Sequence, residues 1–327
     1  MSGKMSDKID VLCEDELIVG YYDDAADASR LEAWQARLQP YLPALKLVPL
    51  ASEAGQKAMA VTVWKPPLGQ IAKMPNLRGI ISLGQGVDHI FRDKTIPQDL
   101  PLVRIVDPDM SVALGHWVCL AVLEKCRKAH DYRALAARRE FRPLPQTDAF
   151  ALKIGVYGVG AIGGEVVRQL VALGFDVTGY ARTKRDDDII SYHTGDEGLD
   201  VMIQEMDIHI CLMPLTDDTR GFFNKARFAQ MKVGAYLINA GRGGHVIEDD
   251  LLEAVNAGHL SGACLDVFEV EPLPEDHAFW GHPHITIWPH VAAQTNPQSA
   301  SQQVAKALLA FHRGTVPENL VDKNKGY

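Results

Sequence analysis

The sequence lacks an apolar run of the roughly 20 residues that a membrane-spanning helix requires. Its 327 residues include only five cysteines, an odd number without paired spacing, which argues against a disulfide framework or a cysteine-based metal site. Lys and Arg (33) are outnumbered by Asp and Glu (42), and the net charge of −9 argues against a nucleic-acid partner. Residues 1–10 are polar and lack the apolar core of a signal peptide. We therefore expect a cytoplasmic protein that binds no metal, nucleic acid or membrane.

The length allows two domains of about 100–200 residues each. Short apolar segments alternate with segments whose apolar residues recur at helical spacing, which predicts an α/β fold with mostly parallel sheets covered on both faces. The predicted strands are 16–21, 46–50, 58–64, 79–82, 151–157, 176–180, 208–212, 235–239, 262–267 and 285–288. The predicted helices are 28–39, 112–140, 165–173, 219–230, 248–257 and 298–313.

A glycine-rich turn, Gly158-Val-Gly160-Ala-Ile-Gly163, lies between the strand 151–157 and the helix that follows. This is the G-x-G-x-x-G spacing of a dinucleotide-binding loop. The first glycine permits the tight turn, the second lets the backbone approach a pyrophosphate, and the third packs helix on strand. The phosphates are then expected at the helix N-terminus, beside Ala161 and Ile162. Alone the motif is weak, since a steric need for glycine would produce it too, but its strand–turn–helix context strengthens it.

The fingerprint starts near residue 155, after a first α/β unit, and a C-terminal helix follows the last strand. We therefore expect two Rossmann-like domains with parallel sheets, the dinucleotide-binding domain being inserted into the other. The expected boundaries are 1–111 with 293–327 for a flavodoxin-like substrate domain, and 112–292 for the NAD(P)-binding Rossmann domain.

The end of the second strand of that domain indicates the preferred cofactor. An NAD-preferring site carries Asp or Glu there, to hydrogen-bond the ribose hydroxyl. Here the strand is followed by Ala181, and then by the polar and cationic residues Arg182, Thr183, Lys184 and Arg185. Guanidinium groups bind phosphate through charge-assisted, bidentate hydrogen bonds. The alternative is a solvated charged loop, but the position favours NADP(H), with NAD(H) possible.

Three polar residues stand just past the ends of the last predicted strands: Arg242, Glu271 and His290. Open α/β sheets bind ligands at that edge. Taken singly, each has an ordinary explanation: Arg242 as a surface cation, Glu271 as an exposed carboxylate and His290 as a loop histidine. The three together carry more weight than any one of them alone.

Several further segments extend this pattern: Ser82-Leu-Gly-Gln-Gly-Val-Asp-His-Ile90, Pro214-Leu-Thr-Asp-Asp-Thr219, Asn239-Ala-Gly-Arg-Gly243, Asp266-Val-Phe-Glu-Val-Glu-Pro272 and Pro289-His-Val291. Together, in this order and over nearly the whole chain, they resemble the D-isomer-specific 2-hydroxyacid dehydrogenases. The segments 180–185 and 239–250, with Trp64-Lys-Pro-Pro67, most resemble the members of that family that reduce glyoxylate and hydroxypyruvate. The chain has Gly241 where alanine is commoner and Gln85 where a small residue is frequent, which puts the substrate preference in doubt.

The resemblance implies roles for individual residues. Arg242 would bind and polarise the substrate, His290 would be the general acid in reduction, and Glu271 would orient His290. The backbone N–H groups of Leu83, Gly84, Gln85 and Gly86 would hold the substrate carboxylate, and Trp64 and Lys65 would shape the substrate end of the site. The residues lining the cofactor would be Leu212, Met213, Pro214, Thr219, Ala240, Gly241 and Asp266, with Arg242 and His290 beside it; Asp266 would accept a hydrogen bond from the nicotinamide carboxamide.

The sequence therefore predicts an NADPH-dependent reductase that converts small 2-oxo acids, glyoxylate and hydroxypyruvate, to D-2-hydroxy acids. Two alternatives stay open: a reductase of bulkier 2-oxo acids, and a non-enzymatic dinucleotide-sensing co-repressor on the same fold, because fold alone does not define function. The resemblance also implies a homodimer. For His116, near the start of the long predicted helix, a structural or interface role is expected.

Overall fold

The computed structural model describes residues 13–24, 28–146, 148–181 and 189–323. The chain forms two compact units, one of Met1–Asp107 with Thr295–Tyr327 and the other of Pro108–Gln294. The second unit is thus an insertion between two parts of the first. The predicted boundaries, after residues 111 and 292, lie four and two residues from those of the structure, after 107 and 294.

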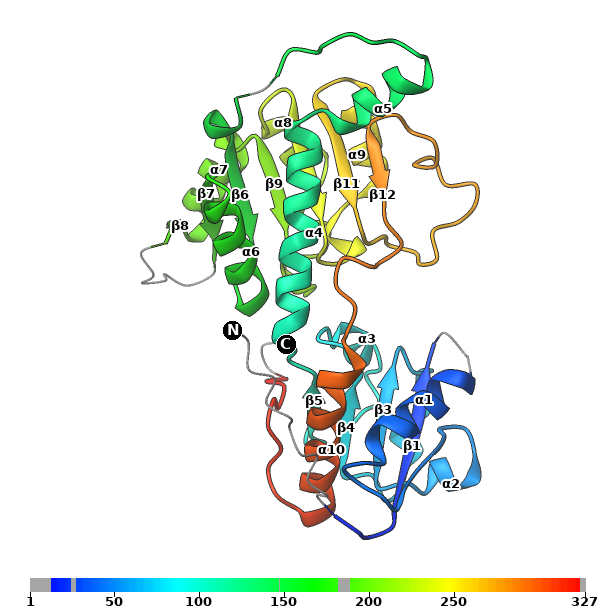
Figure 1. The fold of residues 1–327 in the computed structure, drawn as a ribbon. Coiled ribbons are helices and arrows are strands. Elements are labelled where there is room, and N and C mark those ends of the chain that lie inside the picture. Colours follow the sequence, from blue (N-terminus) through cyan, green and yellow to red (C-terminus); the bar gives the residue numbers. More distant parts are fainter. Residues whose placement is uncertain (1–12, 25–27, 147, 182–188, 324–327) are drawn as a thin grey trace, which may run out of the picture. The chain divides into compact units, whose positions relative to one another are not determined.

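The first unit contains a five-stranded parallel sheet in the order β2-β1-β3-β4-β5 (Figure 1). This is the doubly wound order of flavodoxin-like folds, in which the direction of winding reverses beside the first strand. Its strands are β1 (Leu17–Asp23), β2 (Leu45–Pro49), β3 (Ala60–Trp64), β4 (Gly79–Ser82) and β5 (Leu102–Arg104). Its helices are α1 (Ala28–Leu38), α2 (Glu53–Gln56), η1 (Ile71–Lys73), α3 (Asp88–Phe91) and α10 (Pro297–Arg313).

Helix α10 returns the end of the chain to the core of the first unit. Its buried residues Val304, Leu308 and Phe311 pack with α1 and with one face of the sheet, while η1 and α3 help to cover the other face. Gly79 in β4 leaves room for the Phe311 ring, because a Cβ at residue 79 would lie 2.2 Å from Cζ of that ring. The insertion therefore leaves the first unit with a core built from both of its sequence segments.

The second unit contains a seven-stranded sheet in the order β12-β11-β10-β9-β6-β7-β8, also parallel. The winding direction reverses between β6 and β9, and ligands of open α/β sheets bind at such a switch point. Its strands are β6 (Lys153–Tyr157), β7 (Asp176–Tyr180), β8 (Ser191–His193), β9 (Ile208–Cys211), β10 (Ala235–Asn239), β11 (Leu260–Leu265) and β12 (Ile285–Ile287). Its helices are α4 (Pro108–Cys126), α5 (Ala129–Ala137), η2 (Ala149–Ala151), α6 (Ala161–Ala172), α7 (Gly195–Glu205), α8 (Lys225–Gln230), η3 (Gly243–His245) and α9 (Glu248–Asn256).

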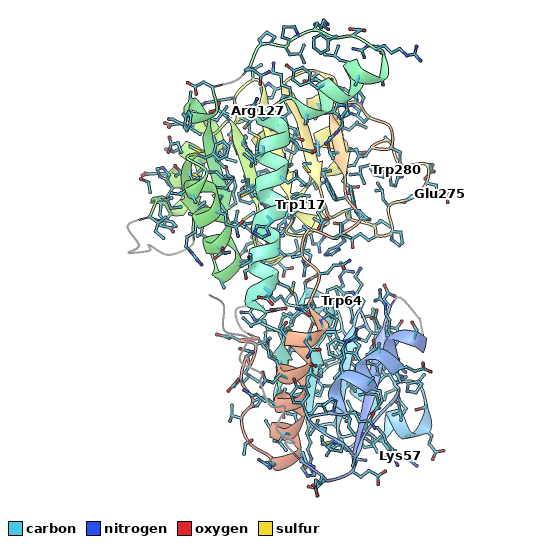
Figure 2. The ribbon with its side chains drawn as sticks, viewed as in Figure 1. Lys57, Trp64, Trp117, Arg127, Glu275 and Trp280 are labelled. Carbon is cyan, nitrogen blue, oxygen red and sulfur yellow. The ribbon has the colours of Figure 1, made fainter. Side chains whose placement is uncertain are left out.

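Side chains alternate between the two faces of this sheet, as the period of a β-strand requires. In β10, Tyr236 and Ile238 point into the core formed with α4 and α6, whereas Ala235 and Leu237 point into the core formed with α7, α8 and α9. Figure 2 shows Trp117 on α4, where its ring packs edge-on against Trp288. Both faces are buried, so these strands read as continuous apolar runs.

The sequence predictions of secondary structure were wrong at several places, and the helices α2, α3 and α7 were not predicted. The helix expected over 112–140 is two helices, since Lys128 takes a left-handed conformation (φ 54°) and turns the chain. The buried apolar face of α4 ends at Cys126, and α5 buries only Leu135, so no common face extends across the turn. Strands β5 and β8 were missed because three residues are too short for a periodicity. The helix expected from residue 219 begins at 225, where Asn224 caps it by accepting the N–H of Arg227.

Among the helices of the described residues, none combines the length and the apolar character that crossing a bilayer requires.

Two adjacent glycines of α6 provide a test of the strand–helix packing. A Cβ at Gly163 would lie 2.2 Å from the carbonyl oxygen of Gly158, whereas a Cβ at Gly164 would have no neighbour within 4 Å. We expect Gly163→Ala to lower the free energy of unfolding by about 1–3 kcal/mol, because the helix must move off the strand. Gly164→Ala should raise it by up to about 1 kcal/mol, because alanine favours a helix. Denaturant unfolding followed by circular dichroism measures both, and equal stability of the two variants would contradict this packing.

Candidate active site

The glycine fingerprint forms the turn between β6 and α6. Gly158 has φ +98°, a conformation that favours glycine, and a Cβ there would lie 2.7 Å from the backbone N of Met213. The turn after β6 therefore touches the segment after β9, on the other side of the switch point. The structure thus brings together two of the predicted cofactor segments, 158–163 and 212–214.

The start of α6 has the features that a pyrophosphate group requires. Gly160 is the N-cap, without a side-chain cap, and a Cβ there would point into open space. The first N–H groups of any helix, here those of Ala161, Ile162 and Gly163, have no partner within the helix, and the helix dipole favours an anion at this end. No acidic residue stands in the first turn of α6. The residues present therefore fit a dinucleotide.

The strand end that was used to predict the cofactor is described only in part. Ala181 follows β7 and donates its N–H to the carbonyl of His193 (3.2 Å). The position where an NAD-preferring protein has a carboxylate is thus occupied by a small side chain. Arg182, Thr183, Lys184 and Arg185 lie outside the described residues.

His290 and Glu271 form a hydrogen-bonded pair. His290 Nδ1 lies 2.8 Å from Glu271 Oε2, and the two side chains are 33% and 20% exposed. A carboxylate can only accept, so Nδ1 carries a proton and donates it. The other carboxylate oxygen, Oε1, accepts the N–H of Phe268 (3.1 Å), which fixes the carboxylate. This arrangement leaves His290 Nε2 as the ring atom that can exchange a proton with a ligand.

The backbone that carries His290 is held by Asp266, which follows β11. The N–H of His290 donates to the Asp266 carbonyl oxygen (2.9 Å), and those of Val291 and Ala292 donate to the Oδ1 and Oδ2 carboxylate oxygens (2.8 and 3.0 Å). Asp266 is 2% exposed. Burial raises the pKa of its carboxyl group above the ordinary value, while the N–H donors of Ala292 and Val291 oppose that rise.

Both carboxylate oxygens of Asp266 bind the loop of His290. The expected role of Asp266 as an acceptor for the nicotinamide carboxamide stays a prediction. His290 has φ +55°, a conformation that is unfavourable for a residue with a side chain. A strained backbone conformation of this kind typically costs about 1–3 kcal/mol. The hydrogen bonds to Asp266 offset that cost.

Arg242 follows β10, the strand next to β11 in the sheet. Its guanidinium Nη1 donates to the carbonyl of Gly241 (2.8 Å), which directs the side chain back along its own loop. The next residue, Gly243, lies against the loop of Glu271: a Cβ there would be 1.8 Å from the carbonyl carbon of Phe268. The loops of Arg242 and Glu271 are therefore in direct backbone contact, beyond the ends of neighbouring parallel strands.

Two buried polar residues of this region were not identified as site residues from the sequence. Asn239 accepts the N–H of Gly241 at Oδ1 (3.1 Å) and donates from Nδ2 to the carbonyl of Arg242 (3.0 Å). His245 contacts the backbone of Arg242 and of Pro214. Both are 0% exposed. A polar residue at the end of an apolar strand was a signal for Asn239, whereas nothing in the local pattern indicated that His245 is buried.

The remaining predicted cofactor residues lie at the same edge of the sheet. Leu212 continues β9 by donating its N–H to the carbonyl of Tyr157 (2.8 Å), and Ala240 donates to Cys211 (3.2 Å). The Thr219 hydroxyl donates to the carbonyl of Pro214 (2.7 Å) and accepts the N–H of Thr216 (2.8 Å). Thr219 thus supports the loop 214–219 from within.

In the first unit, the structure brings Trp64 to the predicted substrate loop. A Cβ at Gly84 would lie 2.5 Å from Trp64 Cζ3, and the Trp64 ring also packs on His89. Lys65 follows with φ +48°. The N–H of Leu83 donates to the carbonyl of Val63 (3.0 Å), and that of Gly84 points to Ser82 Oγ (3.4 Å).

These contacts reduce the number of backbone N–H groups in residues 83–86 that can bind the substrate carboxylate. The Leu83 N–H group is used by the sheet, so it is not a donor for a ligand. Gly84 shares its N–H with a hydroxyl at a long distance, which leaves that donor weakly bound. Among the hydrogen bonds of the described residues, none uses the N–H of Gln85 or Gly86. These two residues are therefore the better candidates for binding a carboxylate.

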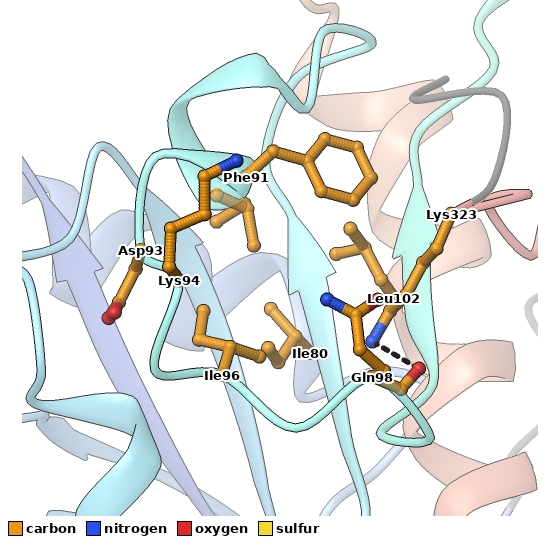
Figure 3. Close-up of a pocket in the computed structure, with 9 residues that line it drawn as sticks. Ile80, Phe91, Asp93, Lys94, Ile96, Gln98, Leu102 and Lys323 are labelled. Carbon is orange, nitrogen blue, oxygen red and sulfur yellow. Dashed lines mark hydrogen bonds between the residues drawn. The ribbon is translucent and has the colours of Figure 1, made fainter.

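A small cavity in the first unit is a different feature (Figure 3). It measures about 50 Å³ and is lined mainly by Ile80, Ile96 and Leu102, with Lys323 at its rim. Lys323 Nζ donates to the carbonyls of Pro97 and Gln98 (2.9 and 3.0 Å). The cavity has room for only a few water molecules and contains none of the predicted site residues.

Comparison with known proteins agrees with this geometry. Residues 119–292 match the family of the D-isomer specific 2-hydroxyacid dehydrogenase, NAD binding domain. The chain is 37% identical to glyoxylate/hydroxypyruvate reductase A of Serratia proteamaculans over 90% of this chain and 96% of that protein. It is 34% identical to the reductase of the same name from Photorhabdus laumondii, over 94% and 99% of the two chains.

Two solved structures are similar over nearly their whole length. One is the NADPH-dependent glyoxylate/hydroxypyruvate reductase of Sinorhizobium meliloti in complex with NADP and sulfate (TM-score 0.86, 35% identity, 95% of this chain and 100% of that chain covered). The other is a D-isomer specific 2-hydroxyacid dehydrogenase of Xanthobacter autotrophicus in complex with NADPH and MES (TM-score 0.86, 32% identity, 95% and 99% covered). The chain belongs to the D-isomer-specific 2-hydroxyacid dehydrogenase family and is an NAD(P)-dependent oxidoreductase.

Proposed function

We propose that this enzyme reduces small 2-oxo acids, glyoxylate and hydroxypyruvate, to the D-2-hydroxy acids glycolate and D-glycerate, with NADPH as reductant. The observation that carries the proposal is the 2.8 Å pair of His290 and Glu271. These residues follow β12 and β11, and β11 lies next to β10, the strand of Arg242. A protein that only senses a dinucleotide needs no such proton donor. The curated relatives, named glyoxylate/hydroxypyruvate reductase A, support the choice of substrates.

The residues divide the chemistry between them. Arg242 binds the carboxylate of the keto acid and polarises the neighbouring carbonyl, because its planar fork of N–H donors matches two oxygens. His290 delivers a proton from Nε2 to the carbonyl oxygen, while its Nδ1–H remains hydrogen-bonded to Glu271. Glu271 fixes the tautomer and stabilises the protonated ring. When bound, the nicotinamide supplies the hydride that the carbonyl carbon receives.

The cofactor would be held by the segments that meet at the switch point. The start of α6, at Gly160 to Gly163, takes the pyrophosphate, and the loop after β9, at Leu212 to Pro214, lines the dinucleotide on the other side. Ala240 and Gly241 lie at the end of β10, beside Arg242. For the substrate carboxylate, Gln85 and Gly86 offer further N–H donors, with Trp64 and Lys65 in the neighbouring loop. The homodimer implied by the resemblance stays a prediction; Leu120 and Leu123 of α4 expose apolar surface that could serve it.

His290→Ala tests the general acid. We expect turnover with glyoxylate to fall by roughly 10²–10⁴, the range for a lost general acid, with NADPH binding retained. Steady-state kinetics and NADPH fluorescence titration measure the two effects. His282→Ala is a matched control, since it removes another histidine of the second unit that contacts only Asn256 and His284 in the described structure. Wild-type turnover in His290→Ala would remove this residue from the mechanism.

Arg242→Lys tests the substrate anchor. Lysine keeps the charge but not the bidentate fork, so we expect KM for the keto acid to rise by about 10–100-fold with KM for NADPH nearly unchanged. Arg220→Lys is the control, because Arg220 forms an exposed ion pair with Glu269 and should be replaceable. If KM for the keto acid were the same in Arg242→Lys as in the wild type, Arg242 would not be the anchor.

The choice between NADPH and NADH depends on the residue after β7. We expect kcat/KM to be at least about ten-fold higher with NADPH, and Ala181→Asp to reverse the order, because a carboxylate there repels a 2′-phosphate and accepts from a 2′-hydroxyl. Kinetics with both cofactors measure the ratio, and the His282→Ala variant should keep the wild-type value. A preference of the wild-type enzyme for NADH would refute the prediction.

A further inference from the structure

His245 is the last residue of η3, and its side chain is fully buried. It lies between two segments that the proposed function uses. Nδ1 is 3.1 Å from the backbone N of Arg242, and Nε2 is 3.3 Å from the carbonyl oxygen of Pro214. The ring therefore spans from the loop of the substrate arginine to the loop that lines the cofactor.

The hydrogen-bond partners determine which ring nitrogen carries the proton. Pro214 offers a carbonyl oxygen, which only accepts, so Nε2 must donate to it. Nδ1 is then the acceptor for the N–H of Arg242. The Arg242 carbonyl oxygen also lies 3.0 Å from Nδ1, but it already accepts from the N–H of His245 (3.2 Å) and from Asn239 Nδ2 (3.0 Å). The Nε2–H tautomer therefore satisfies both the Arg242 N–H and the Pro214 carbonyl. In the Nδ1–H tautomer, Nδ1 could no longer accept the Arg242 N–H.

The His245 ring also lies close to the backbone of Gly241. A Cβ at Gly241 would lie 3.2 Å from His245 Nδ1 and 3.2 Å from the carbonyl oxygen of Met213. The glycine that precedes Arg242 thus lets the ring and the segment 212–214 approach the same stretch of backbone. The Pro214 carbonyl is likewise complete, since it accepts from Thr219 Oγ1 (2.7 Å) as well as from His245.

We propose that His245 is a positioning residue: its Nδ1 fixes the backbone N–H of Arg242 and thereby the substrate anchor, while its hydrogen bond to the Pro214 carbonyl helps to hold the ring in place. This inference rests on the proposed function, in which Arg242 binds the keto acid. In this role the fully buried His245 acts through the N–H of Arg242 and the carbonyl of Pro214. An anchor that is held in this way loses less conformational freedom when the keto acid binds.

Two substitutions separate the two hydrogen bonds. Asparagine places its Oδ1 where the histidine has Nδ1, so His245→Asn keeps an acceptor for Arg242 and loses the contact with Pro214. Glutamine places its Nε2 where the histidine has Nε2, so His245→Gln keeps the donor to Pro214 and leaves the Arg242 N–H without an acceptor. His245→Leu removes both contacts. His209→Gln is the control for loss of a buried imidazole, since His209 is also 0% exposed and bonds only Tyr157 among the described side chains.

We expect KM for glyoxylate to rise by about ten-fold in His245→Gln and at least as much in His245→Leu, because an unsatisfied buried donor is costly. In His245→Asn the rise should be at most about three-fold. The dissociation constant of NADPH, from fluorescence titration, should stay within about two-fold in His245→Gln, and His209→Gln should lower the melting temperature without changing KM. A partial rescue by asparagine but not by glutamine is an effect that general destabilisation does not produce.

Equal KM values in the asparagine and glutamine variants, or a wild-type KM in His245→Leu, would overturn the proposal. Including Arg242→Lys in the same series distinguishes the two levels of inference. If Arg242→Lys is impaired and His245→Leu is not, the role of His245 is wrong and the proposed function stands. If Arg242→Lys keeps the wild-type KM, the assignment of Arg242 fails and the role of His245 fails with it.

Discussion

The active-site edge of the second unit depends on one constraint: buried backbone N–H groups in the loops must find acceptors. Past the ends of β10 and β11, three polar side chains supply them. Asn239 and His245 bind the loop of Arg242, and Asp266 binds the loop of His290. All three are 2% exposed or less. Burying such groups without partners would cost several kcal/mol, so the loops have little freedom to move away from these side chains.

This constraint explains how a reactive side chain can stand on an unfavourable backbone. His290 adopts a positive φ because its own N–H and the next two all converge on one buried aspartate. Successive N–H groups that point the same way form an anion-binding concavity, and here the anion is a side chain of the protein itself. The ring is then aimed at Glu271, whose carboxylate is in turn fixed by the N–H of Phe268.

Much of the fold and most of the candidate site could be predicted from the sequence. The strands β4, β7 and β10 were placed at their observed bounds, because each is a short segment beside a glycine-containing turn, at Gly84, Gly174 and Gly234. Arg242, Glu271 and His290 were singled out because polar residues past strand ends are conspicuous, and the structure brings Glu271 and His290 into hydrogen-bond contact. Strand β8 was not predicted, since three residues are too few to show the alternation of a strand. The turn at Lys128 was not predicted either, because a single residue in the left-handed conformation has no sequence pattern of its own.

The roles of the buried polar residues were harder to predict, for a reason that is general. Asp266 was correctly expected to need a partner, but which donor it meets depends on how a loop 25 residues later folds back on it. His245 shows the same dependence: its neighbours in the chain are glycine and valine, and its acceptor in segment 212–214 lies 31 residues away. A local pattern reports which side chain needs a partner, whereas only the three-dimensional fold decides what that partner is. Buried polar residues such as Asp266 and His245 determine how firmly the groups proposed to contact the substrate are held.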